Sequence, residues 1–182
     1  MSKERHEIVL TGGPCGGKTT LLASTEEWLS ELGYKVLTVP EVATLVIIGG
    51  FKDIGKIAQE DPKNYFELEK QMLLLQFSLR KHFRALAALR SEEKCVLLFD
   101  RGPMDMRAYM LPGYFEAITR DMKLSLAELR DDFDGVIHLV TAAEGAEEFY
   151  TLENNKARME TAEEARALDE RTKNAWIGHP HL

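Results

Sequence analysis

A glycine-rich motif near the N-terminus constrains the fold of this chain more than any other feature. Residues 10–22 read LTGGPCGGKTTLL and contain the pattern G-x-x-x-x-G-K-[ST], which is the phosphate-binding P-loop. The apolar run at residues 8–10 is typical of a buried strand, and the apolar residues after the motif recur at helical spacing. A glycine turn between a strand and a helix N-terminus gathers backbone N–H groups and the positive end of a helix dipole around one point. The motif therefore predicts a binding site for a nucleoside triphosphate.

Two side chains within this motif have distinct expected roles. Lys18 is expected to reach the β- and γ-phosphates, and the hydroxyl of Thr19 is expected to ligate Mg²⁺. The alternative is an ordinary glycine-rich turn, which the flanking strand and helix disfavour. We expect the nucleotide to be ATP or GTP, with Mg²⁺ as the cofactor. The predicted nucleotide-binding residues are Gly12, Gly13, Pro14, Cys15, Gly16, Gly17, Lys18, Thr19 and Thr20.

The length and charge of the chain limit its class and its partners. Its 182 residues suit one domain, residues 1–182, that buries a sizeable core. Thirty acidic and 23 basic residues give a net charge of −7, which argues against a dedicated nucleic-acid binder. No apolar stretch approaches the ~20 residues of a membrane span, and the charged start, residues 1–6, leaves no room for a signal peptide. Because the two cysteines, Cys15 and Cys95, do not suggest a disulfide framework, we expect a cytoplasmic protein.

Strand and helix patterns alternate along the chain, which is typical of a parallel α/β sheet. Helical patterns are predicted at residues 41–48 and 68–86, while residues 51–64 are irregular or hold one short helix. Because the P-loop strand comes first and helices connect the strands, we predict a doubly wound parallel sheet with ligands at the carboxyl ends of its strands. The strands predicted after the P-loop strand are residues 35–39, 95–99 and 135–140.

Charged residues follow two of these strands. Asp100 directly follows the strand predicted at residues 95–99. This is the Walker B position, which holds Mg²⁺ directly or through water, and Arg101 beside it is a candidate for phosphate contact. The alternative is a solvated Asp-Arg pair at a strand end. Glu41 follows the second strand, which Pro40 stops. Its carboxylate is a candidate general base on an acceptor hydroxyl, or simply a favourable charge at a helix N-terminus.

The order of these motifs resembles a known family. TGGPCGGKTT, VPEVAT after the second strand and FDRGPMD after the third look like the P-loop AAA/ATP-binding domain family related to the ribosylnicotinamide kinase domain of NadR. The nucleotide-binding domain of the TRPL translocation defect protein belongs to the same wider group. The polar tail also resembles this group, so the resemblance covers nearly the whole chain. Such domains are similar in fold to deoxynucleoside and thymidylate kinases, which implies the strand order 2-3-1-4-5.

The resemblance also implies roles for single residues. Glu41 and Asp100 correspond to the acidic residues beside the acceptor and the metal, and Arg101 corresponds to an arginine that contacts phosphate. Asp105, in the same DRGxxD pattern, is a candidate to hydrogen-bond a sugar hydroxyl. A simple acid at a helix N-terminus explains Asp105 equally well.

The tail from about residue 143 to residue 176 is polar and helix-prone. The resemblance implies that it is a lid-like region whose arginines close over the transferring phosphoryl group. Arg158 is the preferred lid arginine, with Arg166 and Arg171 as further candidates, although these charges are also typical of a solvated, salt-bridged helix. The family would continue into a fifth strand after residues 179–182, so we expect the last strand to be missing from this sequence.

These residues together predict a Mg²⁺-dependent P-loop kinase that transfers the γ-phosphate of ATP to a nucleoside-like hydroxyl. Either Glu41 or Asp100 would take the proton of the acceptor. The alternative is a switch or binding module that hydrolyses ATP or GTP and signals to a partner or a fused domain. The predicted catalytic residues are Lys18, Glu41, Asp100, Arg101 and Arg158, and the predicted metal ligands are Thr19 and Asp100.

Overall fold

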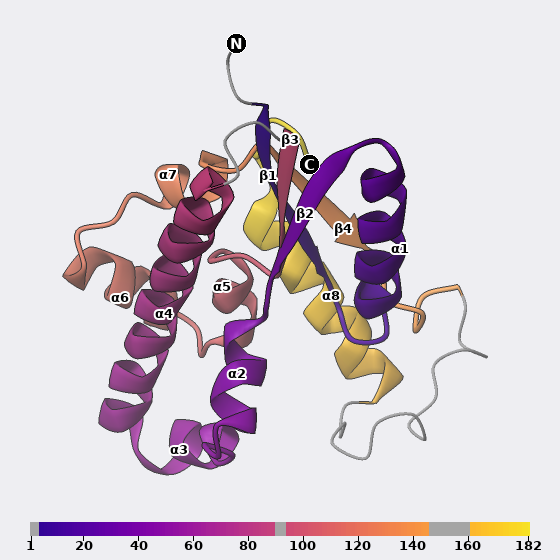
Figure 1. The fold of residues 1–182 in the computed structure, drawn as a ribbon. Helices are drawn as coiled ribbons and strands as arrows, with labels where there is room; N and C mark the ends of the chain where they lie inside the picture. Colours follow the sequence, from indigo (N-terminus) through magenta and orange to yellow (C-terminus); the bar gives the residue numbers. More distant parts are fainter. Residues whose placement is uncertain (1–3, 90–93, 146–160) are drawn as a thin grey trace.

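The computed structural model describes residues 4–89, 94–145 and 161–182, and a parallel sheet forms its centre. The strands are β1 (Arg5–Gly12), β2 (Tyr34–Val39), β3 (Lys94–Asp100) and β4 (Gly135–Leu139). Their order is β2-β3-β1-β4, and each strand is parallel to its neighbours (Figure 1). This order confirms the predicted doubly wound sheet and the first four places of the order 2-3-1-4-5.

The described residues contain four strands, and the end of the chain lies beside β4. The backbone N–H of Val136 donates a hydrogen bond of 2.9 Å to the carbonyl oxygen of His181. Because β4 is an edge strand, residues near His181 lie where the predicted fifth strand would pair.

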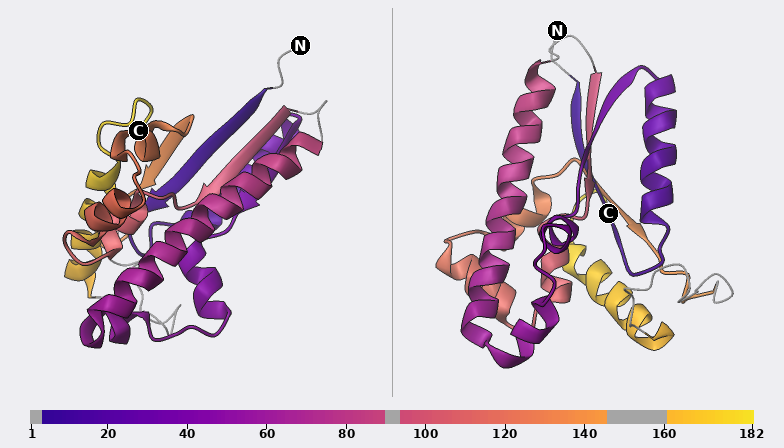
Figure 2. Two further views of the ribbon diagram at one scale, coloured as in Figure 1. Left: turned by 90° about the vertical axis from the view of Figure 1, so that its left-hand side faces the viewer. Right: turned by 60° about the horizontal axis from the view of Figure 1, so that its bottom comes forward.

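Helices connect the strands and cover both faces of the sheet. α1 packs on one face, whereas α4 and α8 pack on the other (Figures 1 and 2). The short helix predicted within residues 51–64 is α3, and the long helix predicted over residues 68–86 is part of α4. The helices of the described residues are α1 (Lys18–Glu31), α2 (Val42–Ile48), α3 (Ile54–Glu60), α4 (Pro62–Leu89), α5 (Asp105–Tyr109), α6 (Tyr114–Asp121), α7 (Leu126–Asp131) and α8 (Ala162–Trp176).

Two apolar layers hold the helices on the sheet, and β3 contributes to both. Its residues 95–99 read CVLLF and are all buried, because helices cover both faces of a doubly wound sheet. Successive side chains of a strand point to opposite faces. Val96 and Leu98 therefore pack in the layer under α1, whereas Cys95, Leu97 and Phe99 pack in the larger layer with α4 and α8.

The structure differs from the expected tail at helix α8. A capping box starts this helix, in which the side chains of Thr161 and Glu164 accept hydrogen bonds from each other's backbone N–H groups. Ala165, Leu168 and Trp176 recur at helical spacing and are buried, and α8 packs against α5 and β1. Residues 162–176 therefore form a helix with one face in the core, whereas the lid-like role of residues 143–176 stays a prediction.

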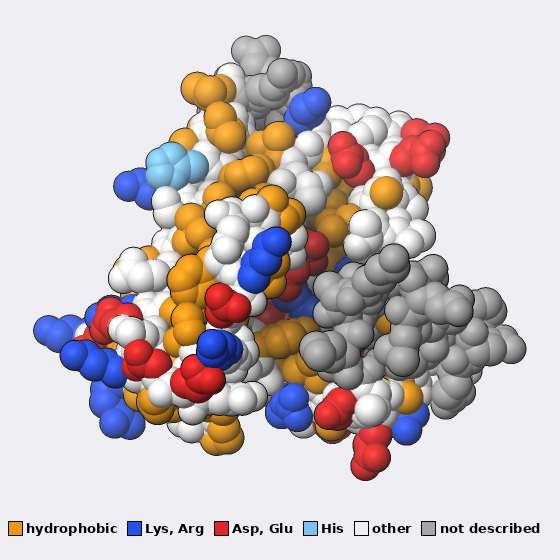
Figure 3. Space-filling view, turned by 90° about the horizontal axis from the view of Figure 1, so that it is seen from below, with side chains coloured by type: hydrophobic (Ala, Val, Ile, Leu, Met, Phe, Trp, Pro, Cys, Tyr) orange, Lys and Arg blue, Asp and Glu red, His pale blue; other side chains and the backbone are white. Residues whose placement is uncertain are grey.

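The register of the strands brings their carboxyl ends to one edge of the sheet. Leu10 lies beside Asp100, and Val39 lies beside Phe99. The turns that follow β1, β2 and β3 therefore open on the same end of the molecule, which is the lower end in Figure 1. Figure 3 shows this end, where acidic and basic side chains gather in a hollow flanked by apolar ones.

Candidate functional site

The P-loop lies between β1 and α1, in the strand–turn–helix setting that the sequence predicts. Gly12 has a φ of 137°, and a Cβ there would lie 2.1 Å from the carbonyl oxygen of Leu139, so only glycine fits. Helix α1 begins at Lys18, with Thr19 and Thr20 in its first turn. The first N–H groups of a helix have no partner within it, so this end of α1 can hold an anion.

The side chain of Lys18 lies over the P-loop. Its ammonium donates hydrogen bonds to the carbonyl oxygens of Gly12 and Gly13, at 3.0 and 2.8 Å. Burial, followed by the positive charge of Arg101, lowers the pKa of Lys18 to about 8. A phosphate in this place would supply the negative charge that stabilises the ammonium.

Asp100, at the end of β3, fits the predicted role of a magnesium ligand. Its Oδ1 atom is buried and has no hydrogen-bond partner among the described residues. Burial, together with the negative charge of Glu41, raises the pKa of Asp100. A bound cation would satisfy such a carboxylate, because Mg²⁺ prefers oxygen ligands.

The described residues contain no cluster of three or more His, Cys, Asp or Glu side chains that could hold a metal. Mg²⁺ in nucleotide sites does not need such a cluster, because one or two protein oxygens are completed by phosphate and water. Asp100 and the exposed Thr19 offer oxygen atoms of the kind that such a site uses.

Arg101 and Glu41 form an ion pair at the mouth of the site. The Nε of Arg101 donates to Oε1 of Glu41 at 2.8 Å, and its Nη1 donates to the carbonyl oxygen of Gly12 at 3.0 Å. The second carboxylate oxygen of Glu41 accepts a hydrogen bond of 2.6 Å from the Thr44 hydroxyl. Although burial opposes its charge, nearby Tyr109 and acidic side chains raise the pKa of Arg101. Arg101 also has a φ of 69°, an uncommon backbone conformation that clusters at functional sites.

Asp105 holds the turn after β3 together. Its carboxylate accepts hydrogen bonds from the Thr11 hydroxyl, from the Gly102 N–H at 2.8 Å and from the Trp176 indole at 3.2 Å. The side chain is 2% exposed. These partners occupy both oxygens, so the geometry favours a structural role for Asp105 over the predicted sugar contact.

Asp169 of α8 belongs to the site, although the sequence interpretation missed it. Its Oδ1 accepts a hydrogen bond of 2.6 Å from the backbone N–H of Gly13. A Cβ at Gly13 would lie 2.8 Å from the Cβ of Asp169, so the absence of a side chain at Gly13 makes room for this contact. His138 of β4 lies nearby, with Nε2 3.3 Å from the same oxygen. Helix α8 thus holds the P-loop in place through Asp169.

The predicted lid arginines have different outcomes. Arg166 donates to the carbonyl oxygen of Ala143 at 2.6 Å, and Arg171 donates to that of Ala108 at 3.2 Å. Both guanidinium groups therefore bind backbone carbonyls of the domain itself. Arg158 lies outside the described residues.

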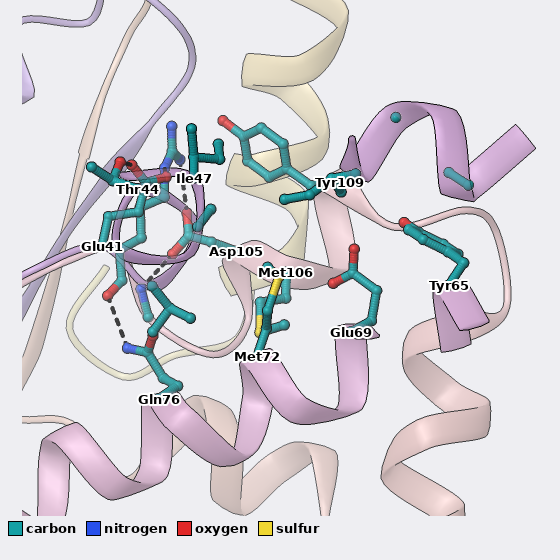
Figure 4. Close-up of a pocket in the computed structure, with 17 residues that line it drawn as sticks. Glu41, Thr44, Ile47, Tyr65, Glu69, Met72, Gln76, Asp105, Met106 and Tyr109 are labelled. Atoms are coloured by element: carbon teal, nitrogen blue, oxygen red, sulfur yellow. Dashed lines mark hydrogen bonds and ion pairs between the residues drawn. The ribbon is translucent and has the colours of Figure 1, made fainter. Parts of the chain in front are cut away.

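A cavity of about 410 Å³ lies beside Glu41 and Arg101. Figure 4 shows Glu41 on one side and Glu69 with Tyr65 on the other, with Met72 between them. The wall is formed by α2, α3, α4, α5 and the turn after β3. Most of this wall is apolar, with Glu69, Gln76 and Tyr109 among its polar members.

The sequence interpretation also missed Glu69 and Gln76 of α4. The helical pattern predicted over residues 68–86 rests on apolar residues at positions 68, 72, 75, 79, 83 and 86, but the buried face includes Tyr65, Glu69, Met72 and Gln76. The spacing of four, three and four residues puts these side chains on one face of a helix. The sequence therefore contained a signal for these two residues, because Glu69 and Gln76 lie three residues before and four residues after Met72 and so share its face of the helix.

The four-stranded order 2-3-1-4, with a P-loop between β1 and α1, defines a P-loop nucleotide-binding protein. A family model described as AAA domain matches residues 7–182, so the chain belongs to this AAA domain family of P-loop NTPases.

A similar solved structure is that of deoxyadenosine kinase from M. mycoides with bound dATP. The two chains are 16% identical with a TM-score of 0.53, over 97% of this chain and 89% of the other. At this identity the similarity shows a shared fold, which is the nucleoside kinase fold. Comparison with curated proteins found no match. Within the described residues, no helix combines the length and apolar character that a bilayer crossing requires.

Proposed function

We propose that this protein is a Mg²⁺-dependent kinase that transfers the γ-phosphoryl group of ATP, or of GTP, to the hydroxyl of a nucleoside-like acceptor. The family resemblance suggests the ribosylnicotinamide kinase domain as the type of enzyme. One observation carries the proposal: the cavity of about 410 Å³ opens beside Glu41 and Arg101, next to the P-loop. A hydrolase needs room only for water at this point, whereas a kinase needs a pocket that positions an acceptor.

The nucleotide side of the proposed mechanism depends on positioning and charge. The N–H groups of the P-loop and the ammonium of Lys18 would hold the β- and γ-phosphates. Thr19 and Asp100 would hold Mg²⁺, which when bound neutralises charge on the phosphate oxygens. The buried Oδ1 of Asp100, which has no hydrogen-bond partner among the described residues, supports this assignment.

The acceptor side of the proposed mechanism depends on Glu41. Glu41 lines the cavity whereas Asp100 does not, so Glu41 is the better placed general base. Its carboxylate would take the proton of the acceptor hydroxyl as that oxygen bonds to the γ-phosphorus. The bond from the γ-phosphorus to the bridging oxygen breaks, and the nucleoside diphosphate leaves with that oxygen. Arg101 keeps the Glu41 carboxylate at the cavity mouth through the 2.8 Å ion pair.

Acceptor-dependent turnover of ATP tests this function. We expect release of nucleoside diphosphate to rise when a nucleoside from a panel is added with MgATP. Glu41→Gln should keep its affinity for MgATP but lose about 10²- to 10⁴-fold in transfer, the usual contribution of a general base. Glu26→Gln, at an exposed position of α1, is the control and should leave both unchanged.

The outcome that contradicts the proposal is equally clear. If no acceptor raises turnover and Glu41→Gln hydrolyses ATP as fast as the wild type, the protein is a switch or an NTPase module. Full loss of nucleotide affinity in Glu41→Gln would also contradict the role of Glu41.

A further inference from the structure

The end of the cavity remote from Glu41 contains a pair of polar side chains that the proposed phosphoryl transfer does not use. Glu69 and Tyr65 lie one turn apart on α4, and both line the cavity. Figure 4 shows Glu69 across the cavity from Glu41, at the end where Tyr65 lies. An acceptor whose hydroxyl meets Glu41 would therefore present its far end to Glu69.

Glu69 is buried, and it has no basic partner among the described residues. It is 5% exposed, and no described Lys or Arg forms a salt bridge with it. Tyr65 is its polar neighbour in the cavity wall, and burial raises the pKa of the Glu69 carboxyl although the Tyr65 hydroxyl favours the charged form. Buried acidic side chains are rare unless they are paired, because removing a carboxylate from water costs free energy.

The surroundings of Glu69 make a ligand contact strong. A carboxylate offers about four lone-pair sites, of which a tyrosine hydroxyl can take only one. The neighbouring cavity wall is apolar and includes Met72, Met106 and Ala58. Hydrogen bonds to a charged group are stronger in such a low-dielectric place than at a solvated surface.

We propose that Glu69 and Tyr65 form a subsite for an amino-bearing nucleobase, which donates N–H hydrogen bonds to the Glu69 carboxyl group. The apolar wall would pack on the faces of the flat ring. Bases that present only carbonyl oxygens at this edge are disfavoured, because they leave Glu69 unpaired and bring two acceptors together. The proposal rests on the assignment of the cavity as the acceptor pocket.

Matched nucleoside pairs test the subsite by binding alone. The pairs are guanosine with inosine, cytidine with uridine, and adenosine with purine riboside, which differ in the amino group or in its replacement by a carbonyl. Binding is measured by calorimetry and by thermal shift, with a non-hydrolysable ATP analogue and Mg²⁺ present. We expect the amino-bearing member of at least one pair to bind about 10- to 100-fold more tightly, as for a hydrogen bond to a charged group.

The variants separate the subsite from general effects on the fold. Glu69→Met keeps a similar volume but removes the acceptor, so the preference for the amino group should disappear while affinity for the ATP analogue stays the same. Tyr65→Phe should reduce the preference. The control Glu67→Met, at an exposed position of the same helix, should keep it.

Three results would overturn the subsite. These are an unchanged preference in Glu69→Met, equal binding within every pair, and binding of no nucleoside at all. The outcome for phosphoryl transfer is separate. If an amino-bearing nucleoside binds through Glu69 but does not raise ATP turnover, the subsite stands and the kinase function falls. If turnover rises equally with both members of each pair, the kinase function stands and the subsite falls.

Discussion

At the scale of single residues, the site combines charged groups that the domain leaves only partly compensated. Lys18 binds carbonyl oxygens of the loop, while Asp100 has a buried oxygen without a partner among the described residues. Within the part of the chain that the structure describes, Glu69 is buried beside a tyrosine and has no cationic partner. Groups of this kind lower stability in the empty protein and become favourable when a ligand supplies the opposite charge or donor.

The first prediction concerns Asp100. Asp100→Asn keeps the size of the side chain but removes its charge, so the increase in nucleotide affinity that Mg²⁺ produces should be lost. We expect a loss of at least about 10- to 100-fold, the effect of removing even an outer-shell partner of a metal. Nucleotide titrations with and without Mg²⁺ measure it. Glu41→Gln is the control and should keep the increase, whereas an equal loss in both variants would refute this division of roles.

The second prediction concerns the pH dependence that Glu69 contributes to stability. Its native pKa is raised above the ordinary value of 4.5, so the folded state holds this proton more tightly than the unfolded state. The resulting stability is complete below that ordinary pKa and is lost as the pH rises through the native pKa. Glu69→Gln cannot lose a proton, so it should gain stability over the wild type as the pH increases.

Urea denaturation of both proteins between about pH 4 and about pH 8 measures this difference. The exposed Glu67→Gln on the same helix controls for a general change of charge. A stability difference between Glu69→Gln and the wild type that does not vary with pH would show that the Glu69 carboxyl is not destabilised by burial.

At the scale of secondary-structure elements, α8 is the main departure from expectation. Its charge pattern suggests a solvated helix, yet it packs on α5 and β1 and supports the P-loop through Asp169. Helix α1 departs in the opposite direction, because Trp28 is 58% exposed although it is one of the apolar residues that recur at helical spacing after the P-loop. Propensity and spacing predict that a helix forms, but neighbouring elements decide which face is covered.

The third prediction tests the contact between α8 and the P-loop. Asp169→Ala leaves the buried N–H of Gly13 without an acceptor, which should cost about 1–3 kcal/mol of stability. It should also weaken nucleotide binding, because the loop is no longer held in place. Asp169→Asn keeps an acceptor and should recover most of both losses. Glu170→Ala, exposed on the same helix, is the control, and an equal effect of Glu170→Ala would contradict the special role of Asp169.

At the scale of the whole molecule, the two apolar layers differ in size, and the C-terminal helix completes the larger one. Trp176 is fully buried there, with ring neighbours that include Phe133 at 5.9 Å between centroids. The same side chain donates to Asp105 in the turn after β3. The end of the chain therefore stabilises both the core and the geometry of the site.

The fourth prediction tests this role of the C-terminal helix. Trp176→Ala should destabilise the protein by about 3–5 kcal/mol, as for other aromatic residues removed from a core. Ile177→Ala changes the next residue, which is 56% exposed, and should cost less than about 0.5 kcal/mol. Urea denaturation measures both variants. Similar costs at the two positions would mean that α8 is not part of the core.

Local patterns were sufficient to predict the P-loop, the strands and the placement of Glu41, Asp100 and Arg101 at one edge of the sheet. The strand and the helix that shape a P-loop lie directly before and after it in the chain, so consecutive residues are enough to predict its geometry. Parallel strands align their carboxyl ends. Residues that directly follow the apolar runs can therefore be predicted to lie close together even when the packing of the helices is unknown.

The amino-acid sequence by itself determined the class of fold and the triphosphate end of the site, because both depend on short-range periodicity and turn geometry. Only the tertiary structure decided the rest. The Asp169–Gly13 contact joins residues 156 positions apart, and the wall of the cavity combines α4 with α2, α3 and α5. Such contacts depend on how helices pack after the chain has closed, and no local pattern records which polar side chain will face the pocket.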